Sequence, residues 1–123
     1  MPSPVEIAVD TYILACCERD AEVRVELLEA CLADDVRMVT SSREIRGRAA
    51  LIQELSRFLG DPQLLRIRVI SAVDARGTTF RYRAVAEMRD GTSAEAFDAG
   101  EIDATGRISL ILTFAGPLAD AAR

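Results

Sequence analysis

Residues 78–88 read TTFRYRAVAEM, and apolar and polar side chains alternate along most of this run. A period of two is typical of a β-strand with one buried face, here carrying Phe80 and Tyr82 opposite Arg81 and Arg83. Three more extended runs cover 65–74, 92–103 and 107–115. The turns between the runs each end in glycine, which suits tight hairpins: 75–77, 89–91 and 104–106. The second half of the chain is therefore predicted to be a four-stranded antiparallel meander.

The first half of the chain carries helical signals. Ser3-Pro4-Val5-Glu6 combines a capping serine, a proline at the first helical position and a glutamate that can reach back. Asp20 resembles the cap of a second helix, and Gly60 followed by Asp61-Pro62 ends a third. The predicted helices cover 4–19, 21–33 and 48–59, with a short strand at 36–40, a polar turn at 41–44 and a return strand at 45–47. Helices followed by strands are the α+β pattern.

Composition removes several kinds of chemistry. The chain has 123 residues, a mass of 13.4 kDa and a net charge of −5, which fits a single domain over 1–123. All 15 positive residues are arginine, and there is no histidine, lysine, tryptophan or asparagine. A histidine-based relay, a histidine zinc site, a Schiff base and a phosphate-loop lysine are therefore excluded. We expect no metal and no cofactor.

Charge and hydropathy also bear on partners. The arginines are interspersed with acids, so the clustered cationic charge that nucleic acid requires is missing. No apolar run approaches the roughly 18 residues that span a bilayer, and the first residues lack the cationic start of a secretory signal. We expect no nucleic acid or membrane partner and a cytoplasmic location. Cys16, Cys17 and Cys31 match no metal-binding spacing and are expected to be reduced, small buried hydrophobes, the first two in mid-helix.

Asp98 is the acidic residue that stands out. It lies inside a predicted strand, where aspartate is disfavoured. By alternation it shares a side with Ala96, Gly100 and Ile102, a small and apolar set that would leave space above the sheet. If Asp98 points inward, burial raises its pKa and makes it a proton donor near neutral pH. The alternative is a solvated aspartate, or one paired with an arginine such as Arg81 or Arg83.

Other residues complete a predicted pocket. Tyr12 falls on the apolar stripe of the first helix, as either a core residue or a hydrogen-bond donor. Asp34-Asp35 is read as a turn that ends the second helix rather than as a metal site. Arg37 and Arg81 are weaker candidates for the lining. The predicted pocket-lining residues are Thr40, Phe58, Tyr82, Ala96, Gly100 and Leu112.

The last predicted strand, ISLILTF over 108–114, has large apolar residues on one side and Ile111 between two hydroxyls on the other. Both faces of this strand are therefore expected to be covered, one by the helices and one by a partner subunit. We expect a homodimer through the outer face of the sheet, with Phe97, Ile111 and Thr113 as contacts. Residues 119–123 are expected to form a frayed tail.

The order of these elements resembles that of the nuclear transport factor 2-like superfamily, and within it the SnoaL-like polyketide cyclases and ketosteroid isomerases. The motifs that carry the resemblance cover about 4–117: Asp20, Leu32-Ala33-Asp34-Asp35-Val36, Ile45-Arg46-Gly47-Arg48 and Gly106-Arg107-Ile108. The resemblance implies a single SnoaL-like domain. Its fold would be a cystatin-like roll, a cone-shaped curved antiparallel sheet wrapped around three N-terminal helices.

The resemblance also implies roles for single residues. Tyr12 matches the tyrosine that donates a hydrogen bond in the isomerases, and Asp98 matches the acid of their oxyanion hole or the acid/base of the cyclases. A carboxylic acid kept neutral by an apolar site is the mechanism known from ketosteroid isomerase itself. Thr40 stands where the isomerases carry the aspartate that moves the proton, so only a one-carboxylate mechanism is supported.

Two functions follow as hypotheses. The first is an isomerase, cyclase or hydro-lyase that transfers a proton on a small, mostly apolar carbonyl compound, with Asp98 and Tyr12 as the catalytic residues. The second is a non-catalytic module of the same fold that binds a hydrophobic ligand or only dimerises, since fold does not determine function. A cavity of several hundred Å³ beside Asp98 would support a ligand site.

Overall fold

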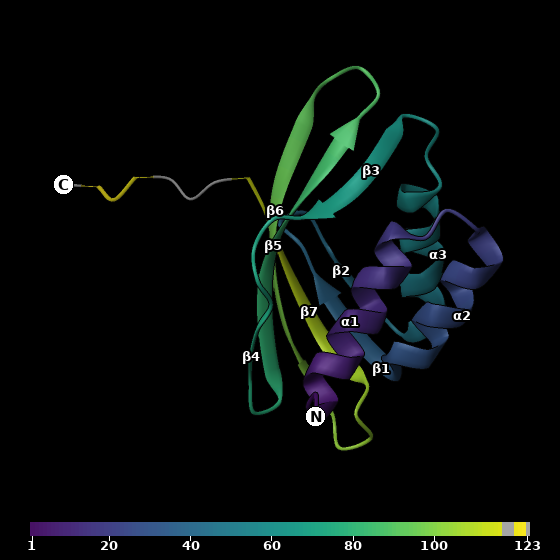
Figure 1. The fold of residues 1–123 in the computed structure, drawn as a ribbon, viewed down its shortest axis with the longest axis vertical. Helices are drawn as coiled ribbons and strands as arrows, with labels where there is room; N and C mark the ends of the chain where they lie inside the picture. Colours follow the sequence, from purple (N-terminus) through teal and green to yellow (C-terminus); the bar gives the residue numbers. More distant parts are fainter. Residues whose placement is uncertain (117–119, 123) are drawn as a thin grey trace.

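The computed structural model describes residues 1–116 and 120–122. Within them, three helices and seven strands form one curved sheet with the helices on one side (Figure 1). The helices are α1 (Pro4–Cys17), α2 (Ala21–Cys31) and α3 (Arg48–Leu59). The strands are β1 (Leu32–Val39), β2 (Glu44–Arg46), β3 (Leu64–Val69), β4 (Asp74–Arg76), β5 (Thr79–Met88), β6 (Ser93–Ile102) and β7 (Ile108–Ala115). The predicted α+β class and curved sheet are confirmed. Of the predicted tail, 119 and 123 lie outside the described residues.

The order of the strands in the sheet is β2-β1-β7-β6-β5-β3, and β4 also pairs with β5. Strands β3, β5, β6 and β7 are antiparallel neighbours, as the predicted four-stranded meander requires. The pairing of β1 with β7 is parallel, so the sheet is mixed rather than wholly antiparallel as predicted. Strand β1 is separated from β7 in the sequence by β2, α3 and the meander. The chain comes back beside β1 only in its last strand, β7, which runs in the same direction as β1.

Both predicted helix caps are present. The Ser3 hydroxyl accepts a hydrogen bond from the Glu6 amide at 3.3 Å, and the Glu6 carboxylate accepts one from the Ser3 amide at 3.1 Å. The Asp20 carboxylate accepts from the amides of Glu22 and Val23 at 2.9 and 3.2 Å. These contacts satisfy amides that the first helical turn leaves free. Ahead of α3, Gly47 has a φ of 92°, a conformation in which glycine avoids strain.

The second helix ends earlier than predicted. The backbone is extended at Leu32, where β1 begins, so Asp34 and Asp35 lie exposed within a strand rather than in a turn. Leu32 and Val36 are fully buried, and Leu32 pairs with Ile108 of β7. Burial of these side chains in the core outweighs the local preference of two aspartates for a turn.

The predicted run over 65–74 is divided into two strands. Strands β3 and β4 both pair with β5, at different parts of its length. In the intervening segment, the Ser71 hydroxyl accepts a hydrogen bond from the Arg83 amide at 2.8 Å, and the Ile70 amide donates to the Arg83 carbonyl at 2.9 Å. The chain can therefore leave the regular ladder without leaving the backbone groups of β5 unpaired.

A β-bulge changes which residues of β7 face the core. Glu101 pairs with Leu110 and Ile102 pairs with Ile108, so Ser109 is an extra residue between them. As a result Ile108 and Ile111 are both fully buried, although strict alternation would place them on opposite faces. The prediction that Ile111 is an outer-face contact is therefore wrong. Leu112 faces outward, so it does not line the pocket as predicted.

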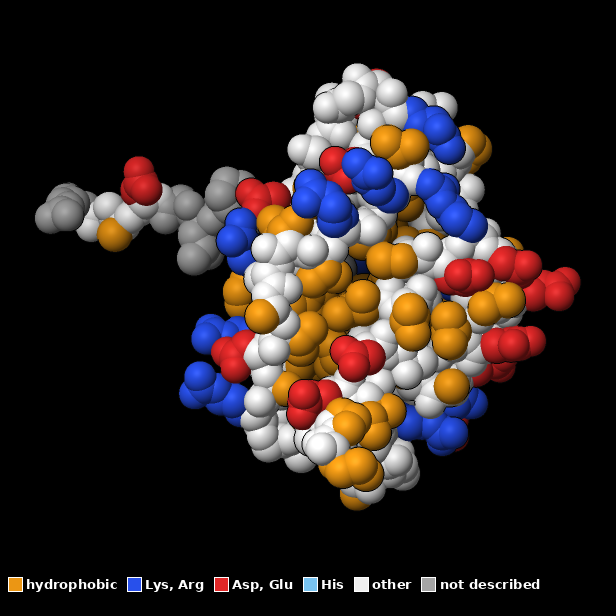
Figure 2. Space-filling model, in the orientation of Figure 1, with side chains coloured by type: hydrophobic (Ala, Val, Ile, Leu, Met, Phe, Trp, Pro, Cys, Tyr) orange, Lys and Arg blue, Asp and Glu red, His pale blue; other side chains and the backbone are white. Residues whose placement is uncertain are grey.

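The core lies between the helices and the inner face of the sheet, and its largest fully buried side chains include Leu28, Leu51, Ile108 and Ile111. Arg24 is also buried, and its Nε and Nη2 donate to the Glu18 carbonyl at 3.3 and 3.2 Å, which ties α2 to the end of α1. Figure 2 shows hydrophobic side chains along the seam between α1 and the neighbouring strands. Within the described chain, no helix has the length and apolar character to cross a membrane.

Candidate functional site

A cavity of about 400 Å³ lies between α1, α3 and the inner face of the sheet. This volume is within the range of small-molecule sites. The structure brings Asp98 and Tyr12 together in its lining with four of the residues that the sequence predicted: Thr40, Phe58, Tyr82 and Ala96. Gly100 and Leu112 are outside the lining. Gly100 faces inward but is covered by the Phe80 ring, whose Cζ would lie 2.7 Å from a Cβ at this position.

Small side chains create the space beside Asp98. On the inner face Ala84 pairs with Ala96 and Ala86 pairs with Ala94 across β5 and β6, and all four line the cavity. Larger side chains of the lining close its other sides: Ile13, Met38, Leu55, Leu59, Ile67 and Val69. The alanines are visible in the sequence as a period of two on both strands. Equal spacing on either side of Asp90 in the turn places them opposite one another across the two strands.

Asp98 lies on the inner face of β6, directly opposite Tyr82 of β5 and Thr113 of β7. The Tyr82 hydroxyl donates a hydrogen bond to Oδ2 of Asp98 at 3.0 Å. The other carboxyl oxygen, Oδ1, is buried and has no hydrogen-bond partner among the residues that the structure describes. No arginine in that part of the chain forms an ion pair with Asp98. The arrangement therefore leaves one carboxyl oxygen of Asp98 without a hydrogen bond, in a carboxyl group that belongs to the lining of the cavity but whose Oδ1 atom is covered by its neighbours.

The protonation of Asp98 follows from these surroundings. Burial raises the pKa of Asp98 above its ordinary value, because the charged form loses its contact with water. The Tyr82 hydroxyl, which is bonded to Oδ2, and the Thr113 hydroxyl, which lies nearby on β7 without a hydrogen bond to either carboxyl oxygen, oppose this rise but do not cancel it. Of the two interpretations left open by the sequence, the structure supports the inward-facing carboxyl and not the arginine-paired one.

Tyr12 lines the cavity from α1 and is 2% exposed. Burial raises its pKa well above the ordinary tyrosine value, so its hydroxyl remains protonated and able to donate. The tyrosine bonded to Asp98, however, is Tyr82, which the sequence placed only in the lining. Tyr82 and Asp98 each lie eight residues from Asp90 at the centre of the predicted turn, and this spacing could have identified the pair.

The two adjacent cysteines also line the cavity. They are the last two residues of α1 rather than mid-helix residues, and Cys17 is exposed, contrary to the prediction of a buried thiol. Burial raises the pKa of Cys16, and it also raises the pKa of Cys17, which is less buried. The negative end of a helix also disfavours a thiolate. These thiols therefore act as apolar lining groups rather than as nucleophiles.

Solved structures share this architecture. A SnoaL-like family protein from Agrobacterium tumefaciens, provisionally assigned as an isomerase, superimposes with a TM-score of 0.78 at 22% identity, covering 93% of this chain and 98% of that one. An NTF2-like protein of unknown function from Mesorhizobium loti gives a TM-score of 0.75 at 16% identity, with coverages of 95% and 98%. No family model and no curated protein matches the sequence.

The chain has the NTF2-like fold. An epoxide hydrolase of the LEH-like type from M. tuberculosis shares it, with a TM-score of 0.69, 19% identity and coverages of 91% and 82%. The resemblance seen in the sequence is thereby confirmed at the level of the fold. Proteins with this NTF2-like cone differ in what they do, so the site itself has to supply the argument for function.

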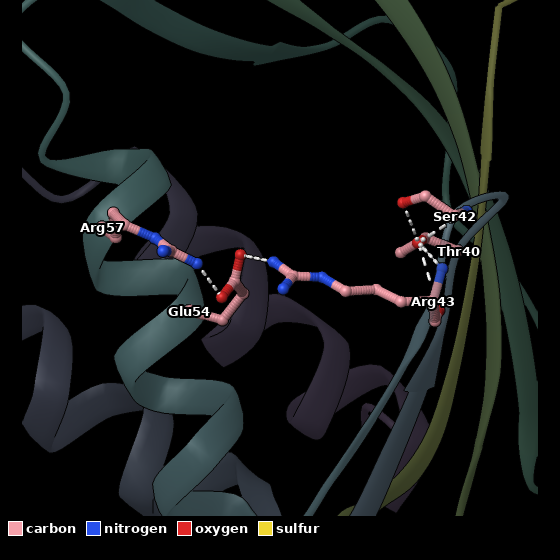
Figure 3. A network of polar contacts seen from close by, with 5 residues as sticks. All are labelled: Thr40, Ser42, Arg43, Glu54 and Arg57. Atoms are coloured by element: carbon pink, nitrogen blue, oxygen red, sulfur yellow. Dashed lines mark hydrogen bonds and ion pairs between the residues drawn. The ribbon is translucent and has the colours of Figure 1, made fainter.

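Polar residues of the turn between β1 and β2 and of α3 form a contact network (Figure 3) at the mouth of the cavity, where the lining residues Ser42 and Arg43 are exposed. Arg43, in the turn between β1 and β2, forms an ion pair with Glu54 of α3, and Arg57 of α3 pairs with the other oxygen of Glu54. Thr40 does not present a free hydroxyl. Its Oγ1 accepts hydrogen bonds from the amides of Ser42 and Arg43, each at 3.3 Å, and so holds the turn. Sequence reasoning missed Arg43 and Glu54.

Proposed function

We propose that this protein binds a small, mostly apolar carbonyl compound in the cone and transfers a proton on it with Asp98. The observation that carries the proposal is a carboxyl group with a raised pKa and one unpartnered oxygen in a cavity of about 400 Å³. A neutral carboxyl group can donate a hydrogen bond to the carbonyl oxygen of a ligand. The apolar lining excludes water and strengthens that interaction.

One carboxyl group can serve as both acid and base. Asp98 gives its proton to the carbonyl oxygen, and the carboxylate that results removes a proton from the neighbouring carbon. The products are the enol and a protonated Asp98, so the step is balanced. Tyr82 holds Oδ2 and orients the carboxyl group, while the Tyr12 hydroxyl lies in the same cavity as a second hydrogen-bond donor for the carbonyl oxygen. Positioned acid/base groups contribute about 10² to 10⁴-fold in rate.

Enolisation is measured directly by deuterium exchange. We expect the protein to accelerate exchange of the α-hydrogens of apolar ketones such as 1-indanone and 2-tetralone in D2O, followed by NMR. Asp98→Asn should reduce the acceleration by about 100-fold or more. Glu101→Gln, on the outer face of the same strand, is the matched control and should leave the rate unchanged. Because the neutral acid starts the reaction, the rate should fall as pH rises through the raised pKa of Asp98.

A non-catalytic binding protein is the second candidate function. The observation in its favour is that the described lining holds no second acid free to move a proton. Its acids are Asp98 and Glu54, and two arginines form ion pairs with Glu54. Thr40, at the position where the isomerases carry the proton-transferring aspartate, is bonded into the turn. Ketone binding detected by NMR line broadening without any exchange would support this candidate and contradict proton transfer.

We also propose a homodimer through the outer face of the sheet. With Ile111 buried and Thr113 in the cavity, the apolar outer side chains are Phe97, Leu110, Leu112 and Phe114. Phe114 is 55% exposed, and contiguous exposed apolar side chains are typical of a protein–protein contact. Light scattering at micromolar concentration should give twice the mass of 13.4 kDa. Phe114→Glu should return the mass to that of one chain, and a single-chain mass for the unmodified protein would contradict the proposal.

A further inference from the structure

The mouth of the cavity has an excess of positive charge. Two guanidinium groups, of Arg43 in the lining and of Arg57 just outside it, share the single carboxylate of Glu54, and each uses one Nη2 for it. A guanidinium group has five N–H donors, so most of them remain free. The side chains of Arg43 and Arg57 are 53% and 69% exposed, whereas that of Glu54 is 25% exposed. The free donors are therefore accessible to a ligand, and the cluster carries one net positive charge.

The turn holds Arg43 in place. The Thr40 hydroxyl accepts from the amides of Ser42 and Arg43, and the Thr40 amide donates to the Arg43 carbonyl at 2.9 Å. Figure 3 shows the Arg43 side chain extending from this turn toward Glu54 on α3. These bonds fix the backbone of Arg43, and the ion pair with Glu54 restrains its side chain, so the side chain has less freedom to lose when it binds a ligand.

The two ends of the cavity differ in what they accept. At Asp98 there is no ion-paired arginine in the described chain, and a raised pKa favours a neutral carboxyl group. An anionic group of a ligand is disfavoured there by desolvation. At the mouth, Arg43 offers the donors and the charge that an anionic oxygen group requires.

From this difference we infer that Arg43 forms a subsite for the carboxylate of the ligand, so that the ligand is an apolar oxo acid with its carbonyl at Asp98. The inference rests on the proposed function and adds the class of substrate. One net positive charge balances a singly charged carboxylate, whereas a doubly charged phosphate would leave the cluster negative. The two ends also give the ligand a single orientation in the cavity.

A pair of fluorescent probes tests the subsite. 8-Anilinonaphthalene-1-sulfonate and N-phenyl-1-naphthylamine share an apolar body, and only the first carries a single negative charge. We expect the unmodified protein to bind the charged dye more tightly. Arg43→Gln should weaken binding of that dye by about 10-fold, the loss of one charge-assisted contact. Binding of the neutral dye should stay within about two-fold, as only the charge contact is removed.

Arg46→Gln is the matched control. Arg46 lies on β2 close to the same turn, pairs with Glu44 at 3.0 Å and is absent from the described lining of the cavity. This variant should bind both dyes as the unmodified protein does. Competition between the dyes shows whether they occupy one site, and the preference for the charged dye should weaken as salt is added.

Each other outcome contradicts a defined part of the inference. Equal affinity for both dyes, or a preference that survives in Arg43→Gln, would overturn the carboxylate subsite and leave the apolar cavity as proposed. If neither dye binds, both the subsite and ligand binding in the cone are overturned. If the charged dye depends on Arg43 but Asp98→Asn leaves the exchange of 2-tetralone unchanged, the subsite stands and proton transfer fails.

Discussion

The carboxyl groups on the two faces of the sheet around β6 have different partners: arginine on the outer face and tyrosine on the inner face. On the outer face Glu95 pairs with Arg83 at 2.6 Å, and Arg81 of β5 pairs with Asp74 of β4 at 2.8 Å. Hydrogen bonds from Arg81 and Arg76 lower the pKa of Asp74. On the inner face Asp98 has a tyrosine for a partner, and burial raises its pKa.

The difference shows how a strand separates two kinds of acid. Asp98 has Tyr82 directly opposite, and Arg81 and Arg83 stand on either side of Tyr82 in the sequence. Because successive side chains point to opposite faces, neither guanidinium group turns toward the cavity. The arginines are thereby matched to acids that remain in water, and the acid in the cavity remains without a counter-ion.

The largest expected effect comes from filling the inner face. A Cβ at Gly100 would meet the Leu110 carbonyl oxygen at 2.1 Å and the Phe80 ring at 2.7 Å. Gly100→Ala should therefore lower the free energy of unfolding by about 3 kcal/mol, since neither backbone nor packed ring can move freely. Urea denaturation measures the change. Ala99→Ser, the neighbour on the outer face, should change it by about 0.5 kcal/mol or less, and equal effects would contradict the contrast between the faces.

Removing the partner of Asp98 should have the next largest effect. Tyr82→Phe removes the hydroxyl group that donates a hydrogen bond to Oδ2 of Asp98. We expect a loss of about 1 to 2 kcal/mol in the free energy of unfolding. The pKa of Asp98 should rise further, because the Tyr82 hydrogen bond lowers it. Carbon-13 NMR titration of the carboxyl group reports this pKa, and an unchanged value would show that Tyr82 does not act on Asp98.

Replacing the acid itself should stabilise the protein near neutral pH. The pKa of Asp98 is raised in the folded state, so folding binds a proton, and stability falls as pH rises from the unfolded pKa through the folded one. Asp98→Asn removes this pH-dependent loss of stability, and the amide oxygen of asparagine can still accept the hydrogen bond of Tyr82. We expect a gain on the order of 1 kcal/mol at pH 8 and little gain at pH 4, measured by urea denaturation. A gain that is the same at both pH values would contradict a buried, titrating carboxyl group.

The smallest expected effect is on the outer face. The side chains of Arg83 and Glu95 are 54% and 43% exposed. Arg83→Gln should change the free energy of unfolding by about 0.5 kcal/mol or less, because water and salt screen exposed pairs. Calorimetry at low and high salt checks this prediction. A loss larger than that of Tyr82→Phe would reverse the comparison between the faces.

Local signals in the sequence were sufficient for the helix starts and for the set of residues that share a side with Asp98, whereas the direction in which that side faces came from the structure. Ser3 and Asp20 cap helices through contacts with residues two or three positions away, so no distant part of the chain is needed. Alternation along β6 is equally local. Local signals failed at Asp34 and Asp35, where two turn-forming residues lie in a strand because Leu32 and Val36 are buried beside them.

The site was predicted less completely than the fold. The bulge at Ser109 reverses the facing of Ile111 and Leu112, and nothing in the run ISLILTF marks where the extra residue is placed. The partner of Asp98 also depends on register, which selects Tyr82 from β5 over Tyr12 from α1. The ion pair between Arg43 and Glu54 joins a turn to a helix that packs beside it. The spacing of the two residues in the sequence does not show that their side chains meet.

The sequence by itself determined the starts of the helices, the absence of histidine and lysine chemistry, and which residues share a side of the strand with Asp98, because these depend on residue type and on a period of two or 3.6. Tertiary structure alone decided that the alanines of β5 and β6 leave a cavity, that Tyr82 holds Asp98, and that Arg43 reaches α3 at the mouth. These features depend on register, curvature and packing between segments distant in the sequence, which are settled only when the whole core forms.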